Sequence, residues 1–503
     1  MTNVPALDPA TVLAVAIIAL SLLLISSYLT TNDWTQSIPQ APQAPIWRRF
    51  FIEPDHDQRK AWADSVPNSG LILYRGMFNK PKILLTTPAA IQEVYQRGAA
   101  NSRRRPPEAT ETSPTDVYTP TDQESVSALL GQTQELVNLL HKAAATDSRV
   151  EISELINRTT LDIVGQAGFG LDFDCLANPD NDLWKEYAAV FRGEGNGARA
   201  GLAWTMLAHL LPGKIVEKFP TKRNEQTAKA VEVVRRRIGG VIAKKKAEIL
   251  ASAEVGRKDS IVDRDEGEEA SNLSKAAIGE GHNDIISACI SEGGITDFEM
   301  LVNQALGILG AGHETIAQTI CLAIFELSKD KTLQTRVRAE IKEHIQSKED
   351  SSSLAATHLD LITSIPLLTA ICNETLRLHP IIPALAREPT PSVNLLGHQI
   401  SQGTVLIIVQ KVFNHNPSLW SQDPSQFLPT RWISDPTGGA KERLAFMTFG
   451  EGPTMCIGEK MARAEMAIVL AGLIREFEME YVGQGRDGQR QKLEFDWGGC
   501  VDD

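Results

Sequence analysis

A cysteine in a glycine-rich loop, just ahead of a predicted helix, is the strongest chemical signal in the chain. Residues 449–458 read FGEGPTMCIG, so Cys456 follows a tight Gly-Pro turn and precedes a segment with the apolar spacing of a helix. Backbone N–H groups and the positive end of the helix dipole at such a position favour a thiolate over a thiol. A thiolate there suits a soft metal or haem iron. The alternative is a redox or core cysteine, but the loop and the helix together favour a metal ligand.

An acid and a hydroxyl lie side by side in a glycine-containing stretch upstream, where residues 306–318 read LGILGAGHETIAQ. Each glycine weakens a helix by about 1 kcal/mol relative to alanine, so a compensating reason for Gly307, Gly310 and Gly312 is expected. Small residues let a flat or bulky group approach the backbone, and Glu314 with Thr315 could deliver protons to an oxygen ligand. The alternative is a helix–helix crossing that requires small residues, and this stretch alone favours that alternative.

A carboxylate and a guanidinium form the third signal, at Glu374 and Arg377 in the sequence ETLR. Their spacing of three places both on one face of a helix. Such a pair contributes little when it is exposed, but the neighbouring Ile371, Leu376 and Leu378 indicate a partly buried helix. A buried pair could organise the neighbouring loops, although the motif alone is common.

These groups need long helices to position them. A capping box, TDFE, predicts a helix that begins at Thr296, with Glu299 three residues on. About thirty residues without proline follow it, which corresponds to roughly 45 Å of helix. Helical patterns cover residues 296–347 and 364–378, and a final helix is predicted over residues 458–477.

A smaller β part is predicted beside the helices. Residues 70–87 form two strands around the FNKP break, residues 88–96 a short helix, and residues 393–409 a strand region with a turn at Gly397 or Gly403. Helices dominate residues 124–246, and residues 101–123 and 251–283 are predicted as loops. The body is therefore one mainly helical domain with a small β region.

Composition excludes several classes of protein. The 503 residues include 50 basic and 63 acidic side chains, a net charge of -13 that gives no global attraction to nucleic acid. Six cysteines are too few for a disulfide scaffold in a chain of this length, and no CxxC pair suggests a zinc ribbon.

The N-terminus predicts a membrane anchor. Residues 12–29 are uncharged and long enough to span a bilayer, and the basic residues that would open a cleaved signal peptide are absent. Arg48 and Arg49 follow the apolar run and favour a cytoplasmic body. We therefore expect an anchor over residues 1–30, a proline-rich linker over residues 31–50 and a catalytic domain over residues 51–503.

Taken together, these segments resemble the cytochrome P450 family of haem-thiolate monooxygenases, of the eukaryotic microsomal type. The resemblance covers residues 70–497 and rests on four motifs in the family's order. The matching residues are Phe449, Gly452, Cys456 and Gly458 in the cysteine loop, Ala311, Gly312, Glu314 and Thr315 in the central helix, Glu374 and Arg377 in the ExxR pair, and Arg431 in FLPTRW.

The resemblance implies roles for these residues. Cys456 would be the axial thiolate ligand of the iron of haem b, Thr315 would hydrogen-bond the iron-bound oxygen, and Glu314 would take part in proton delivery. Arg431 would close a network with Glu374 and Arg377. Arg387, in the sequence ALARE, resembles an arginine that reaches a haem propionate.

The chain also departs from the family pattern. The family normally carries an arginine two residues before the cysteine, where this chain has Thr454, which offers a neutral hydrogen bond and no charge. No tryptophan occurs between Trp62 and Trp184, where the family usually has a helix with a Trp-xxx-Arg pattern. The glycine-rich, acidic GGCVDD ending replaces the expected final hairpin. The early helix and the C-terminal hairpin are therefore expected to be incomplete.

The implied function is insertion of one atom of O2 into an apolar small molecule, in the setting of secondary-metabolite biosynthesis. The implied partners are NADPH-cytochrome P450 reductase, O2, an apolar substrate and membrane lipid, and the implied location is the endoplasmic reticulum membrane, with one span and the body in the cytoplasm. Two alternatives stay open. One is an inactive relative or anchored binding protein, and the other is an isomerase or dehydratase on the same scaffold, against which Glu314 and Thr315 argue.

Overall fold

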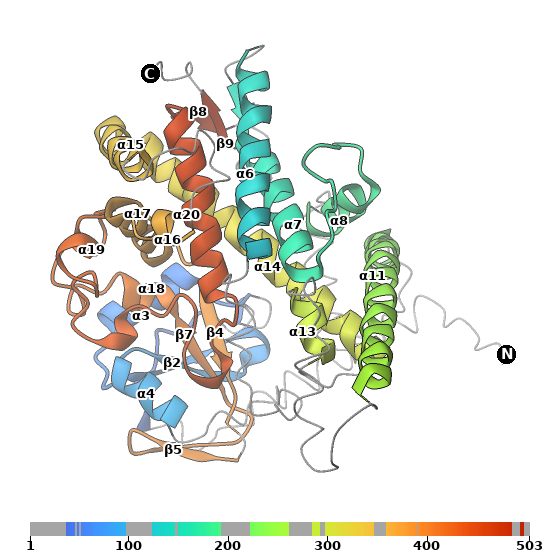
Figure 1. Ribbon diagram of the computed structural model, residues 1–503. Coiled ribbons are helices and arrows are strands. Elements are labelled where there is room, and N and C mark those ends of the chain that lie inside the picture. The colour runs from blue at the N-terminus through green and yellow to red at the C-terminus, as the bar shows by residue number, and fades with distance from the viewer. Residues whose placement is uncertain are drawn as a thin grey trace, which may run out of the picture. The chain divides into compact units, whose positions relative to one another are not determined.

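The computed structural model (Figure 1) describes residues 37–45, 48–49, 52–96, 123–145, 149–192, 222–260, 284–291, 297–346, 359–389, 391–484 and 493–496. The chain divides into two compact units, each assembled from segments that are distant in the sequence. The first unit comprises Met1–Glu108, Ile382–Gln426 and Gly439–Met455, and the second comprises Ala109–Ile381, Phe427–Gly438 and Cys456–Asp503.

A four-stranded sheet organises the first unit, in the order β1-β2-β7-β4. β1 (Leu71–Arg75) and β2 (Pro81–Leu85) are antiparallel around the short helix η2 (Met77–Asn79), which confirms the two strands predicted there. β7 (Val405–Val409) pairs parallel with β2 and antiparallel with β4 (Ala384–Arg387). Because the central strands are almost continuously apolar, most of their side chains are buried.

Short elements surround this sheet. They are α3 (His56–Ser65), α4 (Pro88–Gln96), α18 (Gln410–Asn414), η4 (Arg443–Ala445) and η5 (Gly452–Thr454). A two-stranded sheet of β5 (Val393–Leu395) and β6 (His398–Ile400) turns at Gly397, whose φ of 84° favours glycine. The predicted helix over residues 88–96 and the predicted turn at Gly397 are both confirmed.

One long helix, α14 (Phe298–Ser328), lies in the middle of the second unit. It packs against α7 (Ile152–Phe169), α11 (Lys222–Ser260) and α20 (Glu459–Glu476), and α6 (Gln123–Ala144) packs against α7 and α20 (Figure 1). A buried apolar cluster joins α7, α11 and α14 and includes Phe169, Ile238, Leu301 and Leu309. The predicted mainly helical body with a small β region is thus confirmed.

The remaining elements of the second unit are short or peripheral. The helices are α8 (Asp182–Arg192), α13 (Ile285–Ser291), α15 (Lys331–Gln346), α16 (Leu359–Thr363), α17 (Pro366–Leu378) and α19 (Arg431–Ser434). A three-stranded sheet has the order β3-β9-β8, from β3 (Arg149–Glu151), β8 (Glu480–Gln484) and β9 (Leu493–Asp496).

The structure corrects two predicted boundaries. The N-cap of α14 is Asp297, whose carboxylate accepts a hydrogen bond of 2.7 Å from the N–H of Met300, so the N-cap predicted at Thr296 is one residue early. Helix α11 continues to Ser260, so the loop predicted from residue 251 is wrong for its first ten residues. Ala, Glu and Lys, which are good helix formers, extend the helix there.

Among the described residues, α14 is the helix that is long and apolar enough to cross a membrane. Its packing against α7, α11 and α20 is typical of a core helix. The predicted anchor over residues 12–29 and the predicted loop over residues 101–123 lie outside the described residues, apart from Gln123, which opens α6.

The buried acid Glu465 on α20 gives a pH-dependent prediction. Its side chain is 1% exposed, its Oε1 has no hydrogen-bond partner among the described residues, and burial raises the pKa of this carboxyl well above its usual range. The folded state therefore keeps a proton on Glu465 that the unfolded state releases above about pH 4.3. The free energy of unfolding is consequently not reduced by Glu465 below that pH, and it falls as the pH rises.

We therefore expect Glu465→Gln to gain stability relative to the wild type by up to about 1.4 kcal/mol per pH unit between pH 5 and 8. Denaturant unfolding of the full chain at several pH values would measure this. Glu343→Gln, at an exposed position on α15, is the control for the loss of an acidic side chain. A pH-independent difference for Glu465→Gln would show that the acid is ionised in the folded protein.

Candidate active site

The carboxylate of Glu374, at 0% exposure on α17, accepts five hydrogen bonds. Arg377 donates to both of its oxygens, from Nε to Oε2 and from Nη2 to Oε1, each at 2.8 Å. Arg431 Nε donates to Oε1 at 3.1 Å. The N–H of Leu428 reaches Oε1 at 2.8 Å, and the indole Nε1 of Trp432 reaches Oε2 at 2.9 Å. The structure thus brings together Glu374, Arg377 and Arg431, as the sequence suggested, and adds two further donors.

These donors determine the charge state of Glu374. Burial alone would raise the pKa of the carboxyl, but the hydrogen bonds and charge of Arg377, with the N–H groups of Leu428 and Trp432, outweigh it and hold the pKa below its usual range. A buried carboxylate is tolerated only when its lone pairs are paired in this way. The network therefore ties α17 to residues 428–432. Leu428 lies in the irregular segment before α19, and Arg431 and Trp432 are the first two residues of α19.

A glycine fixes the indole of Trp432 in place. Gly438 has a φ of 65°, and a Cβ added there would lie 2.7 Å from Cε2 of Trp432. The backbone of Gly438 therefore packs directly against the indole ring, which orients Nε1 toward Glu374. A side chain at Gly438 would clash with the ring as well as strain the backbone.

The acid and hydroxyl of α14 lie on an accessible part of the helix. Glu314 and Thr315 are both half-buried, and Thr315 Oγ1 donates to the carbonyl of Ala311 at 2.8 Å. Glu314 Oε1 accepts from Gln318 Nε2 at 3.2 Å. Both predicted residues can therefore contact a ligand at this surface of α14.

The glycines of α14 separate the two interpretations of this stretch. A Cβ added at Gly312 would lie 3.0 Å from Val164 of α7, so Gly312 serves the close crossing of two helices. No described atom lies within 4 Å of a Cβ added at Gly307 or Gly310. The crossing therefore accounts for one of the three glycines, and no described residue packs against a Cβ at the other two.

His313, between Gly312 and Glu314 on α14, is buried in the second unit. Its Nδ1 lies 3.1 Å from the carbonyl of Leu309 and 3.2 Å from Oη of Tyr187 on α8. Burial lowers the pKa of His313 to about 4, so the imidazole is neutral at physiological pH. The contact links α14 to α8 through two buried side chains.

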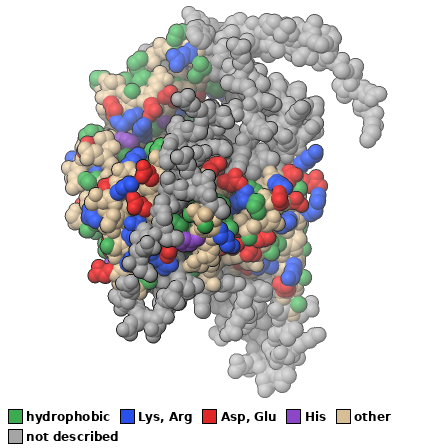
Figure 2. Space-filling model, turned by 90° about the horizontal axis from the view of Figure 1, so that it is seen from above, with side chains coloured by type: hydrophobic (Ala, Val, Ile, Leu, Met, Phe, Trp, Pro, Cys, Tyr) green, Lys and Arg blue, Asp and Glu red, His purple; other side chains and the backbone are tan. Residues whose placement is uncertain are grey.

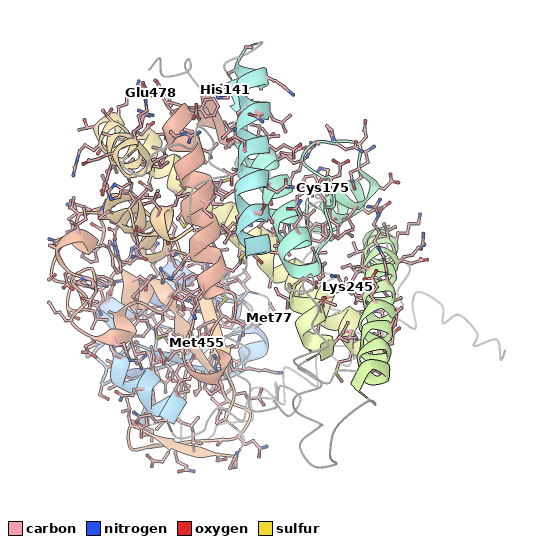
Figure 3. All side chains as sticks on the ribbon, viewed as in Figure 1. Met77, His141, Cys175, Lys245, Met455 and Glu478 are labelled. Atoms are coloured by element: carbon pink, nitrogen blue, oxygen red, sulfur yellow. The ribbon has the colours of Figure 1, made fainter. Side chains whose placement is uncertain are left out.

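Cys456 lies at the start of α20, whose N-cap is Gly458. It is the exposed one of the five cysteines in the described residues, and the others, such as Cys175 near α7 and α8, are buried or partly buried (Figure 3). Desolvation raises the pKa of the Cys456 thiol, and the charge of Glu459 adds to this, whereas the backbone N–H of Gly458 lowers it. The amide acts in the direction that the sequence predicted, but the free thiol remains protonated.

The residues around Cys456 fit a cofactor that brings its own ligands. The described residues contain no group of three or more His, Cys, Asp or Glu side chains that could hold a metal ion. A single accessible sulfur does not complete a tetrahedral zinc site, which needs three or four protein ligands. Cys456 could, however, hold a haem, which supplies most of the ligands of its iron itself, and binding would require the thiolate form of the sulfur.

The loop before Cys456 belongs to the first unit. Gly452 there has a φ of 68°, and a Cβ added to it would lie 3.0 Å from Cδ1 of Tyr95. Phe449 is half-buried, and Met455, the residue before the cysteine, is labelled in Figure 3. Gly452 is therefore required both by the turn and by the packing of the loop on α4.

Arg387 on β4 reaches the same loop. Its Nη2 donates to Oγ1 of Thr454 at 2.6 Å and to Oη of Tyr95 at 3.0 Å, and its guanidinium lies 5.3 Å from the centre of the Tyr95 ring. Thr454, which stands where the family normally carries an arginine, thus contacts Arg387 instead. Tyr95 and Trp432 were not predicted, because their partners are about 290 and 58 residues away and no local pattern marks them.

The comparisons with known proteins agree with these motifs. The model of the cytochrome P450 family matches residues 113–495. Cytochrome P450 monooxygenase sphH of Aspergillus fumigatus is 29% identical over 467 residues, which cover 86% of this chain and 80% of the relative. Cytochrome P450 monooxygenase ptmK of Penicillium ochrochloron is 26% identical over 487 residues, with 88% of each chain covered. For cytochrome P450 monooxygenase FUM15 of Gibberella moniliformis the identity is 28% over 380 residues, covering 67% of this chain and 59% of that relative.

The indole of Trp432 allows a test of the Glu374 network. We expect Trp432→Phe to lower the free energy of unfolding by about 1.5–3 kcal/mol, because it removes a hydrogen bond to a charged group and keeps an aromatic ring in place. The control is Trp420→Phe in the first unit, where Nε1 donates to the neutral carbonyl of Phe413 at 3.0 Å and the loss should be about 0.5–1.5 kcal/mol. Equal losses in denaturant unfolding would contradict an ionised Glu374.

Proposed function

The chain belongs to the cytochrome P450 family, and on that basis we propose that it is a haem-thiolate monooxygenase that inserts one atom of O2 into an apolar small molecule. The observation that carries the proposal is Cys456, the exposed cysteine among those that the structure describes, which lies just before α20 and within the residues that the family model matches. The relatives of the chain are named monooxygenases, which is consistent with an oxidoreductase. The family implies a haem with cysteine thiolate ligation, and we propose haem b.

The residues of this chain would divide the work as follows. Cys456 would hold the haem by its thiolate, with Phe449, Gly452 and Gly458 shaping the loop around it. Bound haem supplies the activation of dioxygen and the transfer of one oxygen atom. The buried network of Glu374, Arg377 and Arg431 would keep α17 and the segment before α19 rigid.

Glu314 and Thr315 would handle protons. The Oγ1 of Thr315 donates to the carbonyl of Ala311 and keeps lone pairs that can accept a hydrogen bond from water or from a protonated ligand. Glu314 is half-buried one residue away and can exchange protons with solvent. Among the described residues, nothing lies within 4 Å of a Cβ added at Gly307 or Gly310, which supports access of a ligand to this part of α14.

We propose a microsomal setting for this reaction. Residues 1–30 would anchor the chain in the endoplasmic reticulum membrane as a single span, residues 31–50 would form a linker, and residues 51–503 would form the cytoplasmic haem domain. NADPH-cytochrome P450 reductase would supply electrons, and the substrate would belong to secondary-metabolite biosynthesis. On the face seen in Figure 2, acidic and basic side chains are interspersed, which together with the net charge of -13 supports the absence of a nucleic-acid partner.

A carbon monoxide difference spectrum of the reduced, full-length protein in membranes tests the proposal. The wild type should give the strongly red-shifted band of a thiolate-ligated haem. Cys456→Ser should lose that band, whereas Cys372→Ser, at a buried cysteine of α17, should keep it. A wild-type chain without the band would favour the inactive relative or anchored binding protein instead.

Replacement of Thr315 tests proton delivery. We expect Thr315→Ala to divert reduced oxygen to peroxide, so that peroxide formed per NADPH consumed rises severalfold with a substrate that turns over. Thr319→Ala is the matched control, because Thr319 also donates to a backbone carbonyl of α14, that of Thr315, but is buried. An unchanged ratio for Thr315→Ala would remove this hydroxyl from the mechanism.

A further inference from the structure

We propose that Tyr95 is a positioning residue for a carboxylate of the cofactor. Tyr95 and Thr454 together orient the guanidinium of Arg387. The Tyr95 hydroxyl also donates a hydrogen bond to that carboxylate, in place of the charge of the arginine that the family carries at the position of Thr454. This inference rests on the haem-binding function proposed above. It concerns one cluster in the first unit, made by the end of α4, the end of β4 and the end of η5.

The guanidinium of Arg387 is oriented but not neutralised. Both protons of Nη2 are used by the hydroxyls of Tyr95 and Thr454, and one proton of Nη1 by the carbonyl of Ala386 at 2.9 Å. An arginine has five N–H donors, so two remain. No carboxylate pairs with Arg387 among the described residues, and Glu451 in the same loop is paired with Arg443 at 2.5 Å. The cluster therefore holds a positive charge with donors still available.

The two hydroxyls are also left with their protons. Each accepts a hydrogen bond from Arg387, and neither has an acceptor for its own O–H among the described residues. Burial raises the pKa of Tyr95, so its phenol stays protonated and can donate. Because Arg387 occupies one lone pair of each oxygen, each O–H must point away from the guanidinium. Two hydroxyl donors beside a guanidinium are the complement of an anion such as a carboxylate.

Packing fixes the ring that carries the Tyr95 hydroxyl. Gly452 approaches Cδ1 closely, and the Arg387 guanidinium lies over the ring. Arg387 itself is held on β4, where it pairs with Leu406 of β7. Thr454 is exposed and Arg387 half-buried, so a ligand carboxylate can reach this side of the cluster. A haem propionate is such a carboxylate, and a free acid is the other source of the same chemistry.

The experiment measures how fast haem leaves the full-length protein, as the rate of its transfer to apomyoglobin. We expect Tyr95→Phe to lose haem about tenfold faster, as for one hydrogen bond to a charged group. Tyr74→Phe is the control, because Tyr74 donates to Glu53 at 3.3 Å in the same unit without touching Arg387, and it should match the wild type. Thr454→Arg, which restores the charge, should return the Tyr95→Phe rate to near the wild-type value.

Haem with both propionates esterified distinguishes a haem propionate from a free acid as the carboxylate that Tyr95 contacts. It also tests whether Tyr95→Phe speeds haem loss only by disturbing the fold. With this cofactor, wild type and Tyr95→Phe should lose haem at the same rate. Three results would overturn the inference. Wild type and Tyr95→Phe could lose ordinary haem at equal rates, the tenfold difference could persist with the diester, or Thr454→Arg could fail to slow the loss from Tyr95→Phe. A wild-type chain that takes up no haem would overturn the proposed function with it, whereas a red-shifted carbon monoxide band with an unchanged Tyr95→Phe rate would overturn this inference alone.

Discussion

The second unit depends on one buried carboxylate. Glu374 is fully enclosed, yet five donors from α17 and residues 428–432 converge on its two oxygens, and together they offset the cost of removing the carboxylate from water. Loss of any one partner leaves a buried charge incompletely paired, at a cost of several kcal/mol when that partner is an arginine. The same all-or-none character lets the network hold an irregular segment, residues 427–430, in one conformation.

Helix α14 shows how one element can serve stability and chemistry together. Consecutive residues face different surroundings: His313 is buried against Tyr187, while Glu314 and Thr315 are half-buried. The glycines divide in the same way: Gly312 lies against Val164, whereas no described residue would contact a Cβ at Gly307 or Gly310. The buried side fixes the rotation of the helix about its axis, and this rotation determines where the acid and the hydroxyl lie.

Local signals in the sequence were sufficient for the helices and for the motif residues, and insufficient for their partners. Apolar spacing predicts α14, α17 and α20, and the spacing of three places Glu374 and Arg377 on one face, whereas only the family resemblance adds Arg431 to the network. The one-residue error at Asp297 arose because Thr and Asp are both good N-caps, and the loop predicted from residue 251 overlooked a helix that charged residues continue. The roles of Tyr95 and Trp432 could not be predicted from the sequence. A tyrosine on an apolar helix and a tryptophan after an arginine are not distinctive, and only their tertiary contacts with Arg387 and Glu374 reveal what they do.

The parallel pairing of β2 with β7 has a consequence for how the protein is made. Lys82 pairs with Val405 and Leu85 with Ile408, so the two strands are separated by 320 residues, from Leu85 to Val405. At about 5–20 residues per second, a ribosome needs roughly 15–65 s to synthesise that interval. During that time the β1–β2 hairpin presents an unpaired, apolar edge, of the kind that invites association with other chains. Slower translation of this interval should therefore reduce the yield of soluble protein without changing the stability of the finished molecule.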